Sequence, residues 1–337
     1  MTTGPAALCP KRMRFGPCGG VRADLSCEVG PVRCPFGTLD DPVPWDGPHP
    51  PRRPEPTLLA TSPVVLTDLT LPPFDRRGLA RVVRSLAGTC DGLLVGEHHN
   101  RPDFPPTQMA GLVRDAGGAP VVTLTCRDRN RVVLDQELAG LAALAGEGPA
   151  AVLCATGDAR AAGMRPEVTQ VFDLDGTALT SHAAAAGLAV GVPESPEAPP
   201  LRLRPGRLAQ KQRAGAQFAV LNPVTGPARL AVFAGRARAA GATLPLVAGV
   251  AVYTDERSAK VLSAFPGLHL DPDRVTTVLS APDPVEAGIA EAVEQARALL
   301  AVDGVVGVNL SGLASSNGPL EGAAVKAAVG RALKDAA

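Results

Sequence analysis

Four cysteines gather near the N-terminus, within the stretch "CPKRMRFGPCGGVRADLSCEVGPVRCPF" of residues 9–36. They are Cys9, Cys18, Cys27 and Cys34. Four thiolates are the ligand set of structural zinc sites and of iron–sulfur clusters. The spacing of eight, eight and six intervening residues is not the paired C-x2-C of a zinc ribbon, so zinc and a [4Fe-4S] cluster both stay open. The stretch has no hydrophobic period, and a bound metal would supply the missing folding energy. We therefore predict a closed metal site with a structural or electron-relay role.

A second group of chemically capable residues follows short apolar runs further along the chain. Asp68 ends "PVVLTDL", "TCRDRN" follows the run that begins at Pro120, and "ATGD" closes the next one. Asn222 and the "NLSG" that contains Asn309 end two later runs. Carboxylates can transfer protons, and hydroxyls and amides can orient a ligand. If the runs are parallel strands of one barrel, these side chains meet at one rim, which is where barrels carry their active sites.

The elements that must position this rim are eight apolar, β-branched runs, most of them about 30 residues apart. They are "PVVLTDL", "GLLVG", "PVVTLTC", "AAVLCA", "GLAVGV", "QFAVLN", "PLVAGVAV" and "VVGVNL". Nearly continuous apolar runs are typical of strands buried on both faces of a parallel sheet. Helical patterns such as "RRGLARVVRSLAG" lie between them. The alternation predicts an α/β fold, a (β/α)8 TIM barrel. A doubly wound sheet is the competitor, weakened because no G-x-G-x-x-G follows the first run. Residues 253–304 have room for two helical segments.

Composition narrows the functional classes. The chain has 337 residues, 45% of them hydrophobic, which is enough for a large core. Its 33 basic and 33 acidic residues give a formal net charge of +0, and aromatic residues make up only 3%. Nucleic acid is therefore not an expected partner. The apolar runs are too short to span a bilayer and no signal-peptide pattern begins the chain, so we expect a cytoplasmic protein with no membrane partner.

Residues 37–56, "GTLDDPVPWDGPHPPRRPEP", contain seven prolines. Proline fixes φ and removes a backbone donor, so this stretch predicts an extended, semi-rigid linker. Its single tryptophan, Trp45, is expected to pin the linker to a surface. The predicted organisation is a four-cysteine metal-binding module over 1–36, a Pro-rich linker over 37–56 and a barrel over 57–337.

Both parts resemble known proteins of one-carbon metabolism. "CPKRM…GPCGG…CEV…C" resembles the cysteine-rich domain that accompanies methylenetetrahydrofolate reductases in some bacteria, usually at the C-terminus or on a separate subunit. The barrel is similar to the reductase itself over nearly all of residues 57–313. The motifs that carry this likeness are "LTDLTLPP", "TLTCRDRN", "VLCATGD", "VFDLDGTALT" and "KQRAGAQFAVLNPV".

The resemblance implies an oxidoreductase that interconverts 5,10-methylenetetrahydrofolate and 5-methyltetrahydrofolate. Asp68 then occupies the position of a family Glu and acts as the acid near N10 of the folate. Asp158 lies beside the flavin and the pterin ring and stabilises positive charge. Asn222 hydrogen-bonds the pterin from the position of a family Gln, and Asn309 is a further substrate contact.

The resemblance also implies a flavin, FAD in the first place. Its predicted contacts are Thr123, Thr156, Gly157, Asp158, Arg204, Arg207 and Lys211. Several of these depart from the family: Thr123 replaces a His, and Arg204 and Arg207 stand where Asp and Asn are frequent. FMN or no flavin at all are therefore kept as alternatives. His98 and His99, in "EHHN", add two donors after the second run. They are expected to be exposed loop residues, with contact to a phosphate or the folate tail as the alternative.

Two other functions stay open. One is another tetrahydrofolate-dependent enzyme, a one-carbon transferase or demethylase built on the same rim. The other is a non-catalytic folate-binding subunit of a complex. The expected partners are a tetrahydrofolate derivative, a redox or methyltransferase protein, and further copies of the chain in a homo-oligomer.

Overall fold

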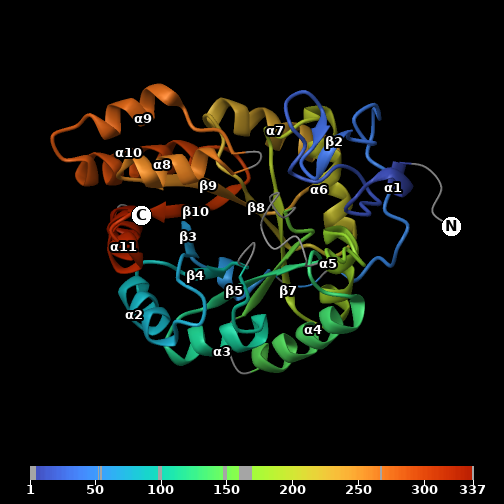
Figure 1. Ribbon diagram of the computed structural model, residues 1–337, viewed down its shortest axis with the longest axis horizontal. Helices are drawn as coiled ribbons and strands as arrows, with labels where there is room; N and C mark the ends of the chain where they lie inside the picture. The colour runs from blue at the N-terminus through green and yellow to red at the C-terminus, as the bar shows by residue number, and fades with distance from the viewer. Residues whose placement is uncertain are drawn as a thin grey trace.

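Eight parallel strands close into a barrel in the order β10-β3-β4-β5-β6-β7-β8-β9 (Figure 1). The computed structural model describes residues 5–51, 53, 55–97, 101–146, 150–158, 169–265 and 268–335. The barrel strands are β3 (Val64–Leu69), β4 (Gly92–Val95), β5 (Pro120–Thr125), β6 (Ala151–Ala155), β7 (Ala189–Glu194), β8 (Phe218–Leu221), β9 (Leu246–Tyr253) and β10 (Val305–Ala314). Each of the eight apolar runs forms one of these strands, so the predicted TIM barrel is confirmed.

Helices surround the strands and bury their outer faces. They are α2 (Arg76–Leu86), α3 (Pro106–Asp115), α4 (Arg131–Ala145), α5 (Gly176–Ala185), α6 (Arg204–Arg213), α7 (Pro227–Ala239), α8 (Glu256–Ser263), α9 (Pro272–Leu279), α10 (Pro284–Leu300) and α11 (Pro319–Lys334). Short 3-10 turns precede the barrel at η1 (Thr57–Leu59) and α6 at η2 (Leu201–Leu203).

The stretch between β9 and β10 holds three helices in its described part, α8, α9 and α10, where the sequence had suggested two. Two Asp-Pro pairs explain the extra break. Asp271 caps α9 and Asp283 caps α10 through their carboxylates, and a proline follows each at the first helical position. Proline is favoured there because the N–H that it lacks has no partner inside the helix. Each pair therefore starts a helix of its own.

The inside of the barrel is filled by side chains, among them Leu66, Val121, Phe218 and Val247. Gly191 on β7 makes room for one of them, because a Cβ at this position would meet the ring of Phe218. A barrel of eight strands is narrow enough for side chains to fill it. The space for a ligand therefore lies at the mouth, beyond the strand ends.

The N-terminal segment, residues 5–36, lies beside α6 (Figure 1). It contains a short helix, α1 (Pro5–Leu8), and a two-stranded antiparallel ribbon of β1 (Ser26–Cys27) and β2 (Gly30–Arg33). Its buried side chains Met13 and Phe36 pack against Leu203 of the barrel. The segment is too small for a core of its own and completes one with a barrel residue.

The proline-rich linker follows the surface of the barrel. Arg202 donates hydrogen bonds to the backbone carbonyls of Gly37 and Leu39. The backbone N–H of Trp45 donates to the side-chain oxygen of Gln210 on α6, and its ring lies 4.8 Å from that of Phe15, between centroids. The linker thus contacts α6 through the backbone of Trp45, and the Trp45 ring packs against the N-terminal segment.

Within the described ranges, no helix has both the length and the apolar character that crossing a bilayer requires.

Candidate functional site at the barrel mouth

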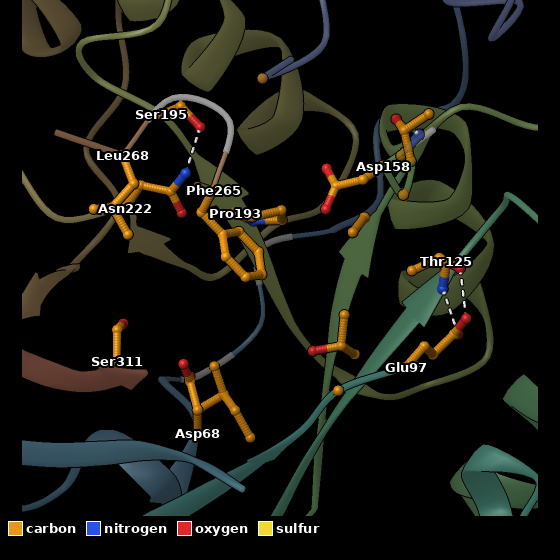
Figure 2. A pocket seen from close by; sticks show the side chains of 18 of the residues that line it. Asp68, Glu97, Thr125, Asp158, Pro193, Ser195, Asn222, Phe265, Leu268 and Ser311 are labelled. Carbon is orange, nitrogen blue, oxygen red and sulfur yellow. Dashed lines mark hydrogen bonds between the residues drawn. The ribbon is translucent and has the colours of Figure 1, made fainter. Parts of the chain in front are cut away.

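A cavity of about 700 Å³ opens at the C-terminal ends of the strands (Figure 2). One part of its wall is polar and contains Asp68, Glu97, Thr125, Asp158 and Asn222. Another part is apolar and is formed by residues that include Met109, Leu262, Phe265 and Leu268. The N-terminal segment adds Lys11, Met13 and Cys18. A concave site of this size, mostly apolar with a few convergent polar groups, is typical of small-molecule binding.

Asp68 is half-buried at the end of β3 and faces the cavity. Its carboxylate accepts hydrogen bonds from Nδ2 of Asn309 at 3.0 Å and from the backbone N–H of Gly312 at 3.2 Å. Both donors are neutral and fix the orientation of the carboxylate. A buried cation also lies nearby, because Nζ of Lys326 donates to the backbone carbonyl of Asp68 at 2.8 Å. The structure thus places Asp68 on the rim, as its position at a strand end predicts.

Asn309 lies behind Asp68 and is only 3% exposed. Besides Asp68, its Nδ2 group also donates to Oγ of Ser311 at 2.9 Å. The cavity wall contains Ser311 and Gly312 but not Asn309. The geometry therefore gives Asn309 the task of orienting Asp68, and the predicted contact with substrate falls to its neighbours.

Glu97 forms a polar cluster that sequence reasoning missed. Its carboxylate accepts from the backbone N–H of Thr125 at 3.0 Å and from the Thr125 hydroxyl at 2.7 Å (Figure 2). It also accepts from Arg129 at 2.7 Å. A glutamate two residues after the end of β4 was the available signal. The neighbouring His98 and His99, which the sequence did suggest as donors, lie outside the described residues.

The end of β6 brings three predicted residues to the mouth. Thr156, Gly157 and Asp158 all line the cavity, as does Thr123 on β5. Gly157 has a φ of +93°, a conformation that favours glycine, and a Cβ there would lie 3.0 Å from Cβ of Thr125. Figure 2 shows the half-buried Asp158 turned toward the middle of the cavity. Asp68 and Asp158 therefore face one space.

Asn222 follows β8 and also faces the cavity. Its Nδ2 donates to Oγ of Ser195 at 2.9 Å (Figure 2). Its backbone N–H donates to the carbonyl of Glu194 at 2.9 Å. These bonds fix the amide at the rim. Ser195 was not among the predicted residues.

A buried charge cluster lies next to this rim. Glu194, at the end of β7, is 3% exposed and accepts from Lys211 at 2.7 Å, with Arg204 at 3.5 Å. Burial alone would raise the pKa of Glu194, but the charges of Lys211, Arg204 and Arg207 outweigh burial and lower the pKa to about 2. Glu194 is thus a permanent anion held by three cations.

The N-terminal segment covers this cluster. Arg204 donates to the backbone carbonyls of Pro17 and Cys18. A Cβ on Gly16 would collide with the Arg207 side chain, and a Cβ on Gly19 would lie 2.9 Å from Oγ of Ser195. The glycines of "FGPCGG" therefore allow the segment to lie directly on α6 and the β7 end.

The packing of the N-terminal segment on α6 affects the predicted flavin site. Arg204 and Lys211 are two of the predicted flavin contacts, yet they donate to Glu194 and to backbone carbonyls. Arg207 donates to the hydroxyl of Thr177 at 3.2 Å and touches Gly16. Several donors of Arg204 and Lys211 are therefore already used, whereas Nε of Arg207 is buried with no hydrogen-bond partner in the described part of the chain. The FAD or FMN assignment stays a prediction.

The four N-terminal cysteines lie in two settings. Cys9, Cys27 and Cys34 are close enough for their charges to interact. The Cys18 thiol instead donates to Oε1 of Glu28 at 3.4 Å and faces the cavity. Among the described residues, which include all four, no group of three or more Cys, His, Asp or Glu stands together as a metal site. The thiols do not form a closed four-ligand set here, and the metal centre stays a prediction.

Lys11 was not anticipated at all. It is 1% exposed, and its Nζ donates to Oε1 of Glu28 at 2.5 Å and to the carbonyl of Gly157 at 2.6 Å. The sequence interpretation kept the cysteine segment apart from the chemistry. The structure instead places Lys11 and Cys18 in the cavity wall.

Comparisons with known proteins support the fold. The sequence matches no protein-family model, and a search of curated proteins finds no relative. Among solved structures, the chain is similar to an uncharacterized protein from Clostridium thermocellum that binds two copies of 5-methyl-5,6,7,8-tetrahydrofolic acid, with a TM-score of 0.56 and 12% identity, over 80% of this chain and 95% of that one. Tryptophan synthase from M. tuberculosis aligns with a TM-score of 0.45 and 14% identity, over 81% and 93% of the two chains. 2,3-Dimethylmalate lyase aligns with a TM-score of 0.43 and 14% identity, over 75% of this chain and 76% of that one.

Proposed function

We propose that the barrel mouth binds a tetrahydrofolate derivative carrying a one-carbon unit and acts on it as a methylenetetrahydrofolate reductase does. The observation that carries this proposal is the pair of half-buried carboxylates, Asp68 from β3 and Asp158 from β6, facing one cavity of about 700 Å³. The structural neighbour that binds 5-methyltetrahydrofolate supports the ligand class. The sequence motifs that hold both acids support the reaction.

The proposed ligand matches the two kinds of cavity wall. The pteridine ring has N–H groups that can donate hydrogen bonds to the Asp158 carboxylate. Asn222 lines the same cavity and is proposed to contact the same ring. The aminobenzoyl ring is apolar and suits the wall of Leu262, Phe265 and Leu268. The apolar wall also excludes water, which strengthens the electrostatic contacts of the polar wall.

Asp68 is the proposed general acid. As the bond between N10 and the methylene carbon breaks, Asp68 gives its proton to N10, and the methylene carbon remains on N5 as an iminium. A hydride from a two-electron donor then reduces the iminium to the methyl group. Asp158 stays ionised and stabilises the positive charge of the iminium. Asn309 and Gly312 hold the Asp68 carboxylate in position for the transfer.

One observation favours a second candidate, folate binding or one-carbon transfer without reduction. Three of the seven predicted flavin contacts, Arg204, Arg207 and Lys211, contact Glu194, Thr177 or the N-terminal segment instead. A protein without a flavin needs another hydride donor, such as a reduced nicotinamide, or performs no reduction.

Calorimetric titration of the full-length protein with 5-methyltetrahydrofolate tests the ligand class. We expect a saturable isotherm, at least tenfold weaker for Asp158→Asn, because the carboxylate contacts the bound ring. Asp41→Asn, an exposed linker residue, is the matched control and should bind like wild type. Absence of binding to the folded wild-type protein would refute the proposal.

The reaction is tested separately by mixing 5,10-methylenetetrahydrofolate with reduced nicotinamide, with and without added flavin. Formation of 5-methyltetrahydrofolate supports the reductase. Folate binding with no product under either condition favours the second candidate.

A further inference from the structure

Lys11 brings a positive charge from the N-terminal segment into the mouth of the barrel. Its ammonium group is bonded to Gly157, 146 residues away in the chain, and the side chain is 1% exposed. Burying an ammonium group without partners is costly. A segment that needed only to cover the rim could do so with an apolar side chain. The position of Lys11 therefore calls for a role in the cavity that it lines.

Lys11 forms a buried ion pair with Glu28, with 2.5 Å between Nζ and Oε1. The two side chains are only 2% and 9% exposed, so the pair is shielded from water and fixed in place. Gly20 permits the close approach of Glu28, since a Cβ at Gly20 would collide with its carboxylate.

An ammonium group has three N–H donors. In the part of the chain that the structure describes, two of them donate to Glu28 and to Gly157. The ring of Phe172 also lies beside the ammonium group, with its centroid 5.7 Å from Nζ. Asp158 is the residue after Gly157, and its carboxylate points to the middle of the cavity (Figure 2). The Asp158 carboxylate also lies near enough to the Lys11 ammonium group for their charges to interact. A cationic donor and an anionic acceptor thus stand next to each other on one wall.

We infer that Lys11 is a specificity-determining residue that reads the 4-oxo group of the pteridine ring; this inference rests on the folate site proposed above. The ring edge presents a 2-amino group and N3–H as donors, followed by the oxygen at C4 as an acceptor. Asp158 accepts from the two donors, and the remaining N–H of Lys11 donates to the oxygen. The acceptor Asp158 thus faces the two donors of the ring edge, and the donor Lys11 faces its acceptor.

A 4-amino pteridine reverses this edge. Its 4-amino group is a donor and would face the ammonium of Lys11, and its N3 carries no hydrogen for Asp158. Charged hydrogen bonds contribute enough that the wild-type protein should prefer the 4-oxo ring by about 10–100-fold. Lys11 supplies part of that preference, and Asp158 supplies the rest.

The test compares dissociation constants of tetrahydrofolate and its 4-amino analogue, tetrahydroaminopterin, for the full-length protein. Lys11→Gln has an amide that can donate or accept, so the preference should narrow by about tenfold. Arg12→Gln makes the same charge change on an exposed neighbour and should keep the wild-type ratio. Thermal midpoints confirm that the variants are folded.

Three results would overturn the inference. An undiminished preference in folded Lys11→Gln removes Lys11 from the recognition. Equal affinity of the wild-type protein for the two ligands also excludes this role of Lys11, whatever the variant shows. The proposed folate site would not be refuted by that result. Failure of the wild-type protein to bind either ligand refutes the folate site together with the inference.

Discussion

Two sectors of the same rim use a carboxylate in opposite ways. In the β3–β10 sector, Asp68 is half-buried and is held by an amide side chain and a backbone N–H. In the β7–α6 sector, Glu194 is 3% exposed and is held by Lys211 and Arg204. Both acids stand at the ends of strands of one barrel.

The difference shows that position at a strand end does not decide what an acid does. The pKa of Glu194 is lowered to about 2 by its three cations, against the effect of burial, so Glu194 has no proton to give near neutral pH. Its cluster instead anchors the N-terminal segment through Arg204. Asp68 faces the cavity and lies where it can exchange a proton with a ligand. One sector is an anchor, and the other is the candidate site of chemistry.

The largest effect that separates the sectors is expected from Asp68→Asn. General acid catalysis contributes about 10²–10⁴-fold in rate, so turnover should fall by that order while folate affinity changes by less than about tenfold. Asn309 and Gly312 donate to different oxygens of the Asp68 carboxylate, and the new amide has only one oxygen, so one of the two bonds is lost and the thermal midpoint should fall modestly. Steady-state kinetics and calorimetry on the same preparations measure all three. Full activity per folded molecule would end the acid assignment.

Glu194→Ala tests the anchor. Removing one partner from a buried ion pair leaves an uncompensated charge and costs about 3–5 kcal/mol of unfolding free energy. Asp303→Ala breaks a surface pair with Arg238, whose side chains are 87% and 46% exposed, and should cost less than about 1 kcal/mol. Denaturant unfolding of both variants gives the comparison. Equal costs would show that the buried cluster is not an anchor.

The anchor also predicts a pH dependence. The folded-state pKa of Glu194, about 2, lies below its ordinary value of 4.5. Its stabilisation is therefore complete above pH 4.5 and is lost as the pH falls from there toward 2. Glu194→Gln should be less stable at pH 7 and should lose less stability over this acid range than wild type. If the free energy of unfolding of both proteins fell equally with pH over this range, the low pKa of Glu194 would be contradicted.

A smaller effect is expected where the segment meets the anchor. Gly16 has a φ of +135°, and a Cβ there would collide with Arg207, so Gly16→Ala should destabilise the docked segment by about 1–3 kcal/mol. Gly30→Ala, in the same segment, has nothing within 4 Å of its new Cβ and serves as the control. Limited proteolysis of residues 5–36 would report the undocking. Identical cleavage of the two variants would argue against close contact at Gly16.

Cofactor content gives the weakest expected signal on the anchor side. Because Arg204 and Lys211 are already paired, freshly purified protein should show no flavin absorption and should bind added FAD or FMN weakly at best.

Elemental analysis should find about one zinc, or several irons, per chain if the cysteines hold the predicted metal. Tightly bound flavin would contradict the anchor, and metal-free native protein would end the metal prediction.

The sequence was sufficient for the barrel because its strands are local patterns. Eight apolar runs identify the strands, and parallel strand ends must share a rim, so Asp68 and Asp158 could be placed together. Contacts between distant residues left no such pattern. Lys11 reaches Gly157 across 146 residues, from a segment with no hydrophobic period to reveal which face is buried. The ion pairs of Glu194 likewise depend on packing of α6 against β7. Asn309 was placed on the correct strand, but which side of the rim it faced depended on the bonds to Asp68 and Ser311.

The central claim is that the N-terminal segment and the barrel mouth form one ligand site. Hydrogen–deuterium exchange of the full-length protein, with and without 5-methyltetrahydrofolate, tests it most directly. We expect ligand-dependent protection in peptides covering both residues 11–19 and residues 155–158. The helix α9 should not change, because none of its residues lines the cavity. Protection confined to the barrel peptides, with residues 11–19 unchanged, would contradict it.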